Sequence, residues 1–165
     1  MNVKVPKSIQ PPLLELEHFL PYRLNVVAET VSRALSQLYA ERYGIGVPEW
    51  RVMAALGEYE RMTAKQVGTH SRMHKTKVSR AVAALEHKRL IEREPNEDDM
   101  REAFLALTGR GLRIYQDLAP RALAFERALD KSLGNGERAH LDAILRRLEE
   151  RAQELADDLV RGGTT

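Results

Sequence analysis

The chain contains no cysteine among its 165 residues. Disulfide scaffolds, thiolate zinc sites and cysteine-based redox sensing are therefore excluded. It also lacks any apolar run near the roughly 20 residues that a membrane-spanning helix needs, and its mean hydropathy is −0.44. The first residues, Met-Asn-Val-Lys-Val-Pro, do not have the pattern of a signal peptide. We therefore expect a cytoplasmic protein without a membrane partner.

The sequence motifs of common enzymes are also missing. There is no Gly-rich phosphate loop and no dinucleotide-binding fingerprint. The adjacent carboxylates Asp98 and Asp99 are more typical of a turn than of a general acid and base. His70 and His74 have the four-residue spacing of zinc ligands, but a turn is expected between them and neither has a cysteine or carboxylate partner. We predict no enzymatic activity, no cofactor and no metal.

The residues that are present predict a mainly helical chain. Hydrophobic residues make up 43% of it and charged residues 30%, which is enough apolar surface to build a core. A first long helix is predicted to begin near Pro21, with an apolar stripe from Leu24 to Leu38. A further helix should bend at Pro120. After the break at 134–136, the final helix places leucines from 141 to 159 in a heptad seam, the pattern of helices that pack along another long helix. One chain has too little surface to cover both seams, so we predict a homodimer.

The charge is concentrated in one segment, which we name the basic block (residues 63–93). It carries eight Lys or Arg against two Glu, a net charge of +6, whereas the whole chain carries +2. Residues 94–102 carry five acids against one arginine, a net charge of −4. A basic block inside a neutral chain indicates a local anion-binding surface, although a solvated helix face would give the same count.

The basic block also has the pattern of a helix-turn-helix. Thr63 and Gln66 have the spacing of a capping box, which opens a short helix ending around residues 70–71. A second helix follows over about 74–88, with an apolar stripe at Val78, Ala81, Val82 and Leu85. Two short extended runs, 90–94 and 103–107, flank a polar tip and predict a β-hairpin. This order of elements is that of a winged helix-turn-helix.

The exposed residues of the second helix have the chemistry of groove reading. An α-helix fits the major groove of DNA, where cationic and hydroxyl side chains reach base edges. The residues that the apolar stripe leaves outside are Lys75, Thr76, Lys77, Ser79 and Arg80.

Residues 48–111 closely resemble the MarR family of bacterial transcriptional regulators. The resemblance depends on several fragments in family-like order and spacing, and the flanking long helices resemble the family's dimerisation region. The fragments are Thr63-Ala64-Lys65-Gln66-Val67, Thr76-Lys77-Val78-Ser79-Arg80-Ala81-Val82, Leu85-Glu86, Leu90-Ile91-Glu92-Arg93, Asp99-Met100-Arg101 and Leu107-Thr108-Gly109-Arg110-Gly111.

This resemblance implies a single unit over 1–165, with a DNA-binding lobe at 48–107 and dimerisation helices at 13–43 and 108–160. It implies a homodimeric repressor on a pseudo-palindromic operator, released by a small ligand that is often an aromatic acid or a related thioester. Lys75 to Arg80 match the recognition helix, Arg101 matches a wing-tip arginine that enters the minor groove, and Asp99 matches the aspartate that holds that tip. From the charge pattern, Lys65, Arg72 and Lys88 are candidates for phosphate contacts.

Candidates for an effector pocket are aromatic residues and nearby cations, although packing in the dimer core is the better explanation for any one aromatic. They are His18, Tyr22, Arg23, Tyr39, Trp50, Arg51 and Tyr115. Two alternatives to a ligand-responsive repressor remain at this stage. One is a constitutive or architectural DNA-binding regulator without an effector, and the other is a protein-interaction module built on a winged helix.

Two residues depart from the family pattern. Arg89 stands where a glycine often precedes the first wing strand, so the turn there is expected to be built differently. His74 stands where Ser or Asp commonly caps the recognition helix, and it is expected to cap less well at neutral pH.

Overall fold

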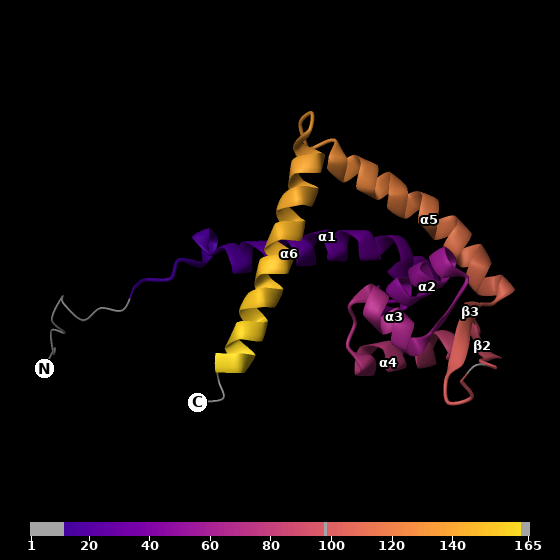
Figure 1. The fold of residues 1–165 in the computed structure, drawn as a ribbon. Helices are drawn as coiled ribbons and strands as arrows, with labels where there is room; N and C mark the ends of the chain where they lie inside the picture. Colours follow the sequence, from indigo (N-terminus) through magenta and orange to yellow (C-terminus); the bar gives the residue numbers. More distant parts are fainter. Residues whose placement is uncertain (1–11, 98, 163–165) are drawn as a thin grey trace, which may run out of the picture. The chain divides into compact units, whose positions relative to one another are not determined.

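The computed structural model describes residues 12–97 and 99–162, and it shows a mainly helical chain with one small antiparallel sheet (Figure 1). This confirms the predicted fold class. The chain divides into two compact units between Ala119 and Pro120. After a single 3-10 turn at Leu16–His18, the elements are α1 (Leu20–Tyr43), α2 (Val47–Tyr59), β1 (Arg61–Thr63), α3 (Ala64–Ser71), α4 (Lys75–His87), β2 (Ile91–Pro95), β3 (Ala103–Leu107), α5 (Gly109–Asp130) and α6 (Glu137–Gly162).

Helix α1 begins and ends where its sequence predicts. Pro21 lies in its first turn, where a missing N–H costs nothing. Gly44 ends the helix with φ of 60°, a left-handed conformation that glycine adopts without strain, and its N–H donates to the Ala40 carbonyl.

The core of the first unit lies between α2, α3, α4 and the sheet. Its members come from every one of these elements, and they include the whole predicted apolar stripe of α4. The buried hydrophobic residues are Tyr39, Ile45, Val52, Met53, Ala55, Leu56, Met62, Val67, Met73, Val78, Ala81, Val82, Leu85, Leu90, Ile91, Leu105 and Leu118. This core fixes the position of α4, because one whole face of that helix is packed inside the lobe.

The sheet has one strand more than the predicted hairpin. Strands β2 and β3 pair antiparallel as expected, and β1 pairs with the other edge of β3, giving the order β1-β3-β2. Met62 of β1 lies opposite Leu105 of β3, and both side chains are buried. The wing is therefore joined to the helix-turn-helix through β1, which ends at the cap residue of α3.

The turn from α4 into β2 differs from the expectation. Arg89 itself adopts the left-handed conformation, with φ of 56°. The Leu90 N–H donates to the Leu85 carbonyl and the Arg89 N–H to the Glu86 carbonyl, which is the Schellman arrangement that glycine usually completes. This conformation is less stable for an L-residue by roughly 1–2 kcal/mol. The turn thus has the backbone conformation that is usual with glycine, although the residue is an arginine.

Thr108 joins this turn to the start of α5. Its hydroxyl donates to the Arg89 carbonyl at 2.9 Å and accepts from the Gly111 N–H at 3.0 Å. Gly111 packs directly against Leu90, because a β-carbon there would overlap the Leu90 carbonyl oxygen. The turn after α4 and the beginning of α5 are therefore in close contact, and only glycine fits at 111.

The second unit contains the later part of α5 and all of α6. Helix α5 continues through Pro120 rather than ending there, and the predicted break at Gly134–Gly136 separates it from α6. Arg138 of α6 forms ion pairs with Glu126, Asp130 and Asp142. These hydrogen bonds raise the pKa of the Arg138 guanidinium above its usual range. None of the residues of α6 is buried within this chain.

Across the described residues, no helix combines the length and the apolar character that crossing a membrane requires.

Candidate nucleic-acid interface

The capping box at Thr63 is confirmed and starts the helix-turn-helix. The Thr63 hydroxyl accepts from the Gln66 N–H at 3.2 Å, and the Gln66 side-chain oxygen accepts from the Thr63 N–H at 2.8 Å. This reciprocal pair satisfies two backbone donors that would otherwise have no partner at the helix start. Because Thr63 is also the last residue of β1, the cap fixes α3 relative to the sheet.

The turn between α3 and α4 has a left-handed residue in its middle. Arg72 has φ of 51°, and the following Met73 donates its N–H to the Gly68 carbonyl while its side chain enters the core. The turn therefore anchors its apolar residue inside and leaves Arg72, a predicted phosphate contact, exposed at the surface.

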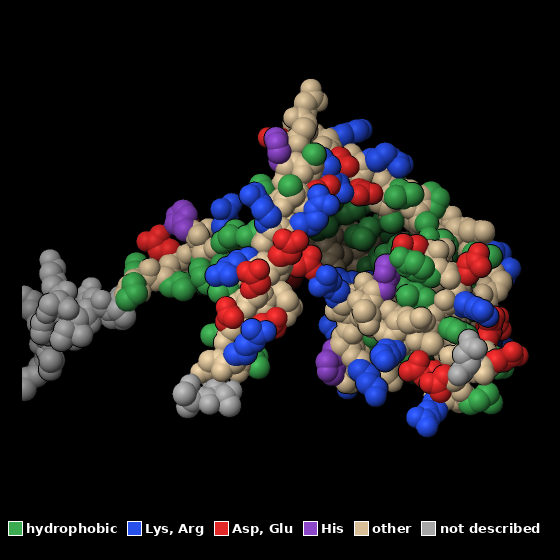
Figure 2. All heavy atoms as spheres, viewed as in Figure 1, with side chains coloured by type: hydrophobic (Ala, Val, Ile, Leu, Met, Phe, Trp, Pro, Cys, Tyr) green, Lys and Arg blue, Asp and Glu red, His purple; other side chains and the backbone are tan. Residues whose placement is uncertain are grey.

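Helix α4 has the two faces that its sequence predicts. Val78 is 2% exposed and Ala81 is 1% exposed, whereas the predicted groove-reading side chains Lys75, Thr76, Lys77, Ser79 and Arg80 are all exposed. Lys65, on α3, is exposed as well. Figure 2 shows Lys and Arg side chains over α3 and α4 and Asp and Glu side chains beside them at the wing.

His74 caps α4 through its imidazole ring. Its Nδ1 accepts from the Thr76 N–H at 3.3 Å. His70 does not join it: its Nε2 lies 3.3 Å from a Glu58 carboxylate oxygen, and its ring packs edge-on against Tyr59. The two histidines thus have separate structural partners.

Asp99 holds the wing tip through its backbone contacts. Its Oδ1 accepts from the Arg101 N–H at 3.0 Å, and its own N–H donates to Asn96 Oδ1 at 3.3 Å. Arg101 is exposed and forms no ion pair with any residue that the structure describes; the neighbouring Asp98 lies outside the described residues. Asp99 therefore positions the tip, while the Arg101 side chain remains available.

An ion pair that the sequence analysis missed ties the wing to α4. Arg93 of β2 binds Glu86 of α4 through two bonds, Nε to Oε1 at 2.6 Å and Nη2 to Oε2 at 3.2 Å. The bonds to Glu86 raise the pKa of the Arg93 guanidinium. Arg93 thus serves the wing rather than the anion-binding surface, although both residues belong to the basic block.

The effector candidates fall into two separate groups. The rings of Tyr39 and Trp50 stack with centroids 5.6 Å apart, and Trp50 stacks on Tyr115 at 6.3 Å. Burial raises the pKa of the Tyr39 phenol, an effect that Arg51 partly opposes. The structure therefore brings Tyr39, Trp50, Arg51 and Tyr115 together.

The second group lies at the other end of α1. His18, Tyr22 and Arg23 are exposed, and the 17 residues from Tyr22 to Tyr39 extend over roughly 25 Å of helix. No single small molecule can contact both groups within one chain.

Residues 43–102 match the sequence model of the MarR family. The winged helix of this chain is therefore similar to that family. No protein in the curated collection compared with the chain matches it significantly.

Solved structures of MarR-family proteins have the same fold. A MarR/EmrR family transcriptional regulator from Acinetobacter sp. ADP1 matches with a TM-score of 0.77 and 24% identity, over 86% of this chain and 99% of that one. The MarR-family regulator Sco3205 from Streptomyces coelicolor, solved in complex with DNA, has a TM-score of 0.73 and 24% identity, over 87% and 92%. MepR from S. aureus, in a DNA complex, has a TM-score of 0.74 and 18% identity, over 81% and 98%.

Proposed function

We propose that this chain is a DNA-binding transcriptional regulator of the MarR type and not an enzyme. The observation that carries the proposal is the division of α4, with its apolar face packed in the lobe and its cationic and hydroxyl face exposed. The family match over 43–102 and the DNA complexes of proteins with the same fold support it. We assign DNA binding to 48–107 and dimerisation to the helices of 13–43 and 108–160.

We assign the reading of DNA bases to α4 and the contacts with DNA phosphates to residues that flank it. Arg80 carries a fork of donors that can pair bidentately with guanine in the major groove, and Lys75 and Lys77 lie on the first turn. Lys65 and Arg72 flank this helix and are assigned to phosphates. Arg101 projects from a tip that carries several acids, so an A·T-rich minor groove, with its strong negative potential, is its most favourable position.

We further propose that the regulator acts as a homodimer. On α6, the apolar seam stays exposed within one chain: Leu155 is 47% exposed and Leu159 is 78% exposed. On α1, Leu24 is 40% exposed and Val27 is 61% exposed. A two-fold partner would cover such surfaces and would supply a second reader for the second half-site.

The ligand-responsive form of the function is supported by the aromatic stack. Tyr39, Trp50 and Tyr115 come from α1, α2 and α5, so a flat aromatic acid or its thioester inserted among their rings would move three helices at once. We therefore propose a repressor that such a ligand releases. Thermal stabilisation of the protein by one member of a panel of aromatic acids and their thioesters supports this form, whereas stabilisation by none favours the constitutive regulator.

The deciding experiment is a gel shift with the intergenic DNA upstream of the protein's own gene. Arg80→Ala is expected to cost roughly 1–3 kcal/mol of binding free energy and to relax the preference at one base pair per half-site, because a bidentate contact to guanine is lost. Arg113→Ala, an exposed arginine of α5, is the matched control and should leave the preference unchanged. Equal affinity of the wild type for operator and random DNA would contradict the proposal.

Arg101→Ala tests the wing separately. We expect weaker operator binding with an unchanged major-groove preference, and a smaller effect when the flanking A·T pairs are replaced by G·C. If this variant binds as tightly as the wild type, the wing is not a DNA contact.

A further inference from the structure

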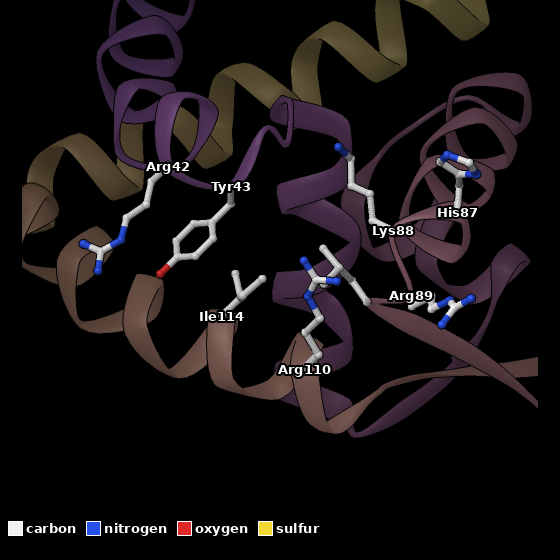
Figure 3. A pocket seen from close by; sticks show the side chains of 8 residues that line it. Arg42, Tyr43, His87, Lys88, Arg89, Arg110 and Ile114 are labelled. Carbon is white, nitrogen blue, oxygen red and sulfur yellow. The ribbon is translucent and has the colours of Figure 1, made fainter.

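A cleft of about 400 Å³ opens in the first unit (Figure 3). It lies where the end of α1, the end of α4 and the start of α5 meet. Its lining residues are Arg42, Tyr43, His87, Lys88, Arg89, Leu90, Arg110 and Ile114. The volume is that of a small-molecule site, for which roughly 300–1,000 Å³ is usual.

The charge of this lining is of one sign. Four of the eight lining residues are Lys or Arg, and none is Asp or Glu. Asp117 lies close to one flank, but it accepts a hydrogen bond from the Tyr43 hydroxyl at 2.7 Å and pairs with Arg42 at 3.9 Å. Lys88, Arg89 and Arg110 form no ion pair with any carboxylate of the described residues. Three uncompensated cations gathered in a concave site attract an anion.

Lys88 and Arg110 are the cations that point inward. Figure 3 shows Arg110 extending beside Ile114 and Lys88 extending above it toward the end of α1, with Arg42 and Arg89 on the two flanks. The Lys88 ammonium reaches the end of α1, where a β-carbon on Gly44 would lie 3.5 Å from its Nζ. The tyrosine ring, Leu90 and Ile114 provide an apolar wall next to the two cations.

The cleft is separate from the predicted base-reading residues, although Lys88 was also a candidate for a DNA phosphate contact. Lys88 follows the last turn of α4, whereas Lys75 to Arg80 occupy its first two turns. At 1.5 Å per residue, Lys75 and Lys88 are roughly 20 Å apart along the helix. A helix that enters the major groove by its N-terminal end holds its C-terminal end away from the base edges.

We propose that this cleft binds a small organic phosphate, with the phosphate oxygens on Lys88 and Arg110 and a ring against Tyr43 and Ile114. Several cations without a carboxylate partner match a multiply charged phosphate better than a single carboxylate, and an Arg guanidinium forks onto two phosphate oxygens. The apolar wall favours a ligand with a ring over inorganic phosphate. This site is additional to the aromatic stack, and its occupation does not depend on DNA binding.

The test is isothermal titration of the purified, DNA-free protein with ADP, GDP and pyrophosphate. We expect a nucleotide to bind, and pyrophosphate to bind at least tenfold more weakly because it cannot use the apolar wall. Arg110→Gln and Lys88→Gln should each weaken nucleotide binding by tenfold or more, whereas Arg113→Gln, which removes the same charge one turn further along α5, should not. Arg110→Lys should retain part of the affinity, which separates lost charge from a folding defect.

Four results would overturn the proposal, the last of them in the pyrophosphate titration. The first is no binding of either nucleotide, and the second is equal weakening in Arg113→Gln, which would indicate only the general charge of the lobe. The third comes from the gel shift: if Arg110→Gln and Lys88→Gln weaken operator binding while Arg113→Gln does not, the cleft is a contact for a DNA phosphate. Pyrophosphate binding as tight as that of the nucleotides would exclude the ring and assign the site to an inorganic phosphate.

Discussion

Helices α4 and α6 are both amphipathic, but only α4 has a buried apolar face. The four apolar residues that were predicted to face inward on α4 are at most 2% exposed. On α6, Leu145 is 44% exposed and Leu155 is 47% exposed, and no residue of that helix is buried. The same kind of stripe therefore has two outcomes: on α4 it completes a lobe, and on α6 it stays exposed.

The largest expected effect comes from charging the uncovered stripe. Leu155→Glu should give a monomer or an aggregate, because a carboxylate in a dimer seam would be buried without a partner. Operator affinity should fall by roughly 10²-fold or more, since two linked readers bind far more tightly than one. Light scattering and gel shift measure the two effects. Gln153→Glu, on the opposite face of α6, is the control. If the wild type is monomeric at micromolar concentration with its fold intact, the proposed homodimer is wrong.

The next largest effect is expected in the lobe that contains α4. Gly111→Ala should destabilise the lobe by about 2–3 kcal/mol in urea unfolding, because the added methyl must displace the Leu90 backbone. The control is Gly109→Ala, where the nearest atom to the new methyl is the flexible end of Arg113 at 3.8 Å. Similar stabilities for the two variants would show that α5 does not pack against the turn as described.

A smaller effect of opposite sign is expected at the neighbouring turn. Arg89→Gly should stabilise the lobe by about 1 kcal/mol, because glycine adopts positive φ without strain. Lys88→Gly is the control, since Lys88 has an ordinary φ of −79° and glycine there should only lose stability. A destabilised Arg89→Gly protein would mean that the arginine side chain contributes more to the fold than its backbone costs.

The smallest effect is expected in the second unit. Arg138→Ala removes three exposed ion pairs with Glu126, Asp130 and Asp142, and exposed pairs contribute little and are screened by salt. The melting temperature should change little at low salt and not at all at high salt. A large, salt-independent decrease would show that the unit is held by these pairs rather than by a covering partner.

The lobe could be predicted from sequence because its signals are local. The capping box at Thr63 and the stripe from Val78 to Leu85 each depend on neighbouring residues, and the structure confirms both. Strand β1 was missed because three residues are too few to show an alternating pattern, and because its last residue already signals a helix start. The conformation of Arg89 was missed because tertiary contacts of Thr108 and Leu90, not the arginine's own preference, fix that turn.

The candidate sites were predictable only in part, for the same reason. The exposed residues of α4 follow from its periodicity. By contrast, the cleft joins segments around residues 42, 88 and 110, and no pattern in the sequence indicates that these three meet. The stack of Tyr39, Trp50 and Tyr115 is equally non-local, whereas the separation of Tyr22 from Tyr39 follows from helix length alone.

The hydroxyl of Thr108 has a mechanical consequence. It bonds the turn after α4 on one side and the first turn of α5 on the other, so it fixes the start of α5 against the helix that carries Arg80. Helix α5 has 22 residues and continues into the second unit. The first turn of α5 therefore cannot tilt without breaking a bond to the turn that follows α4.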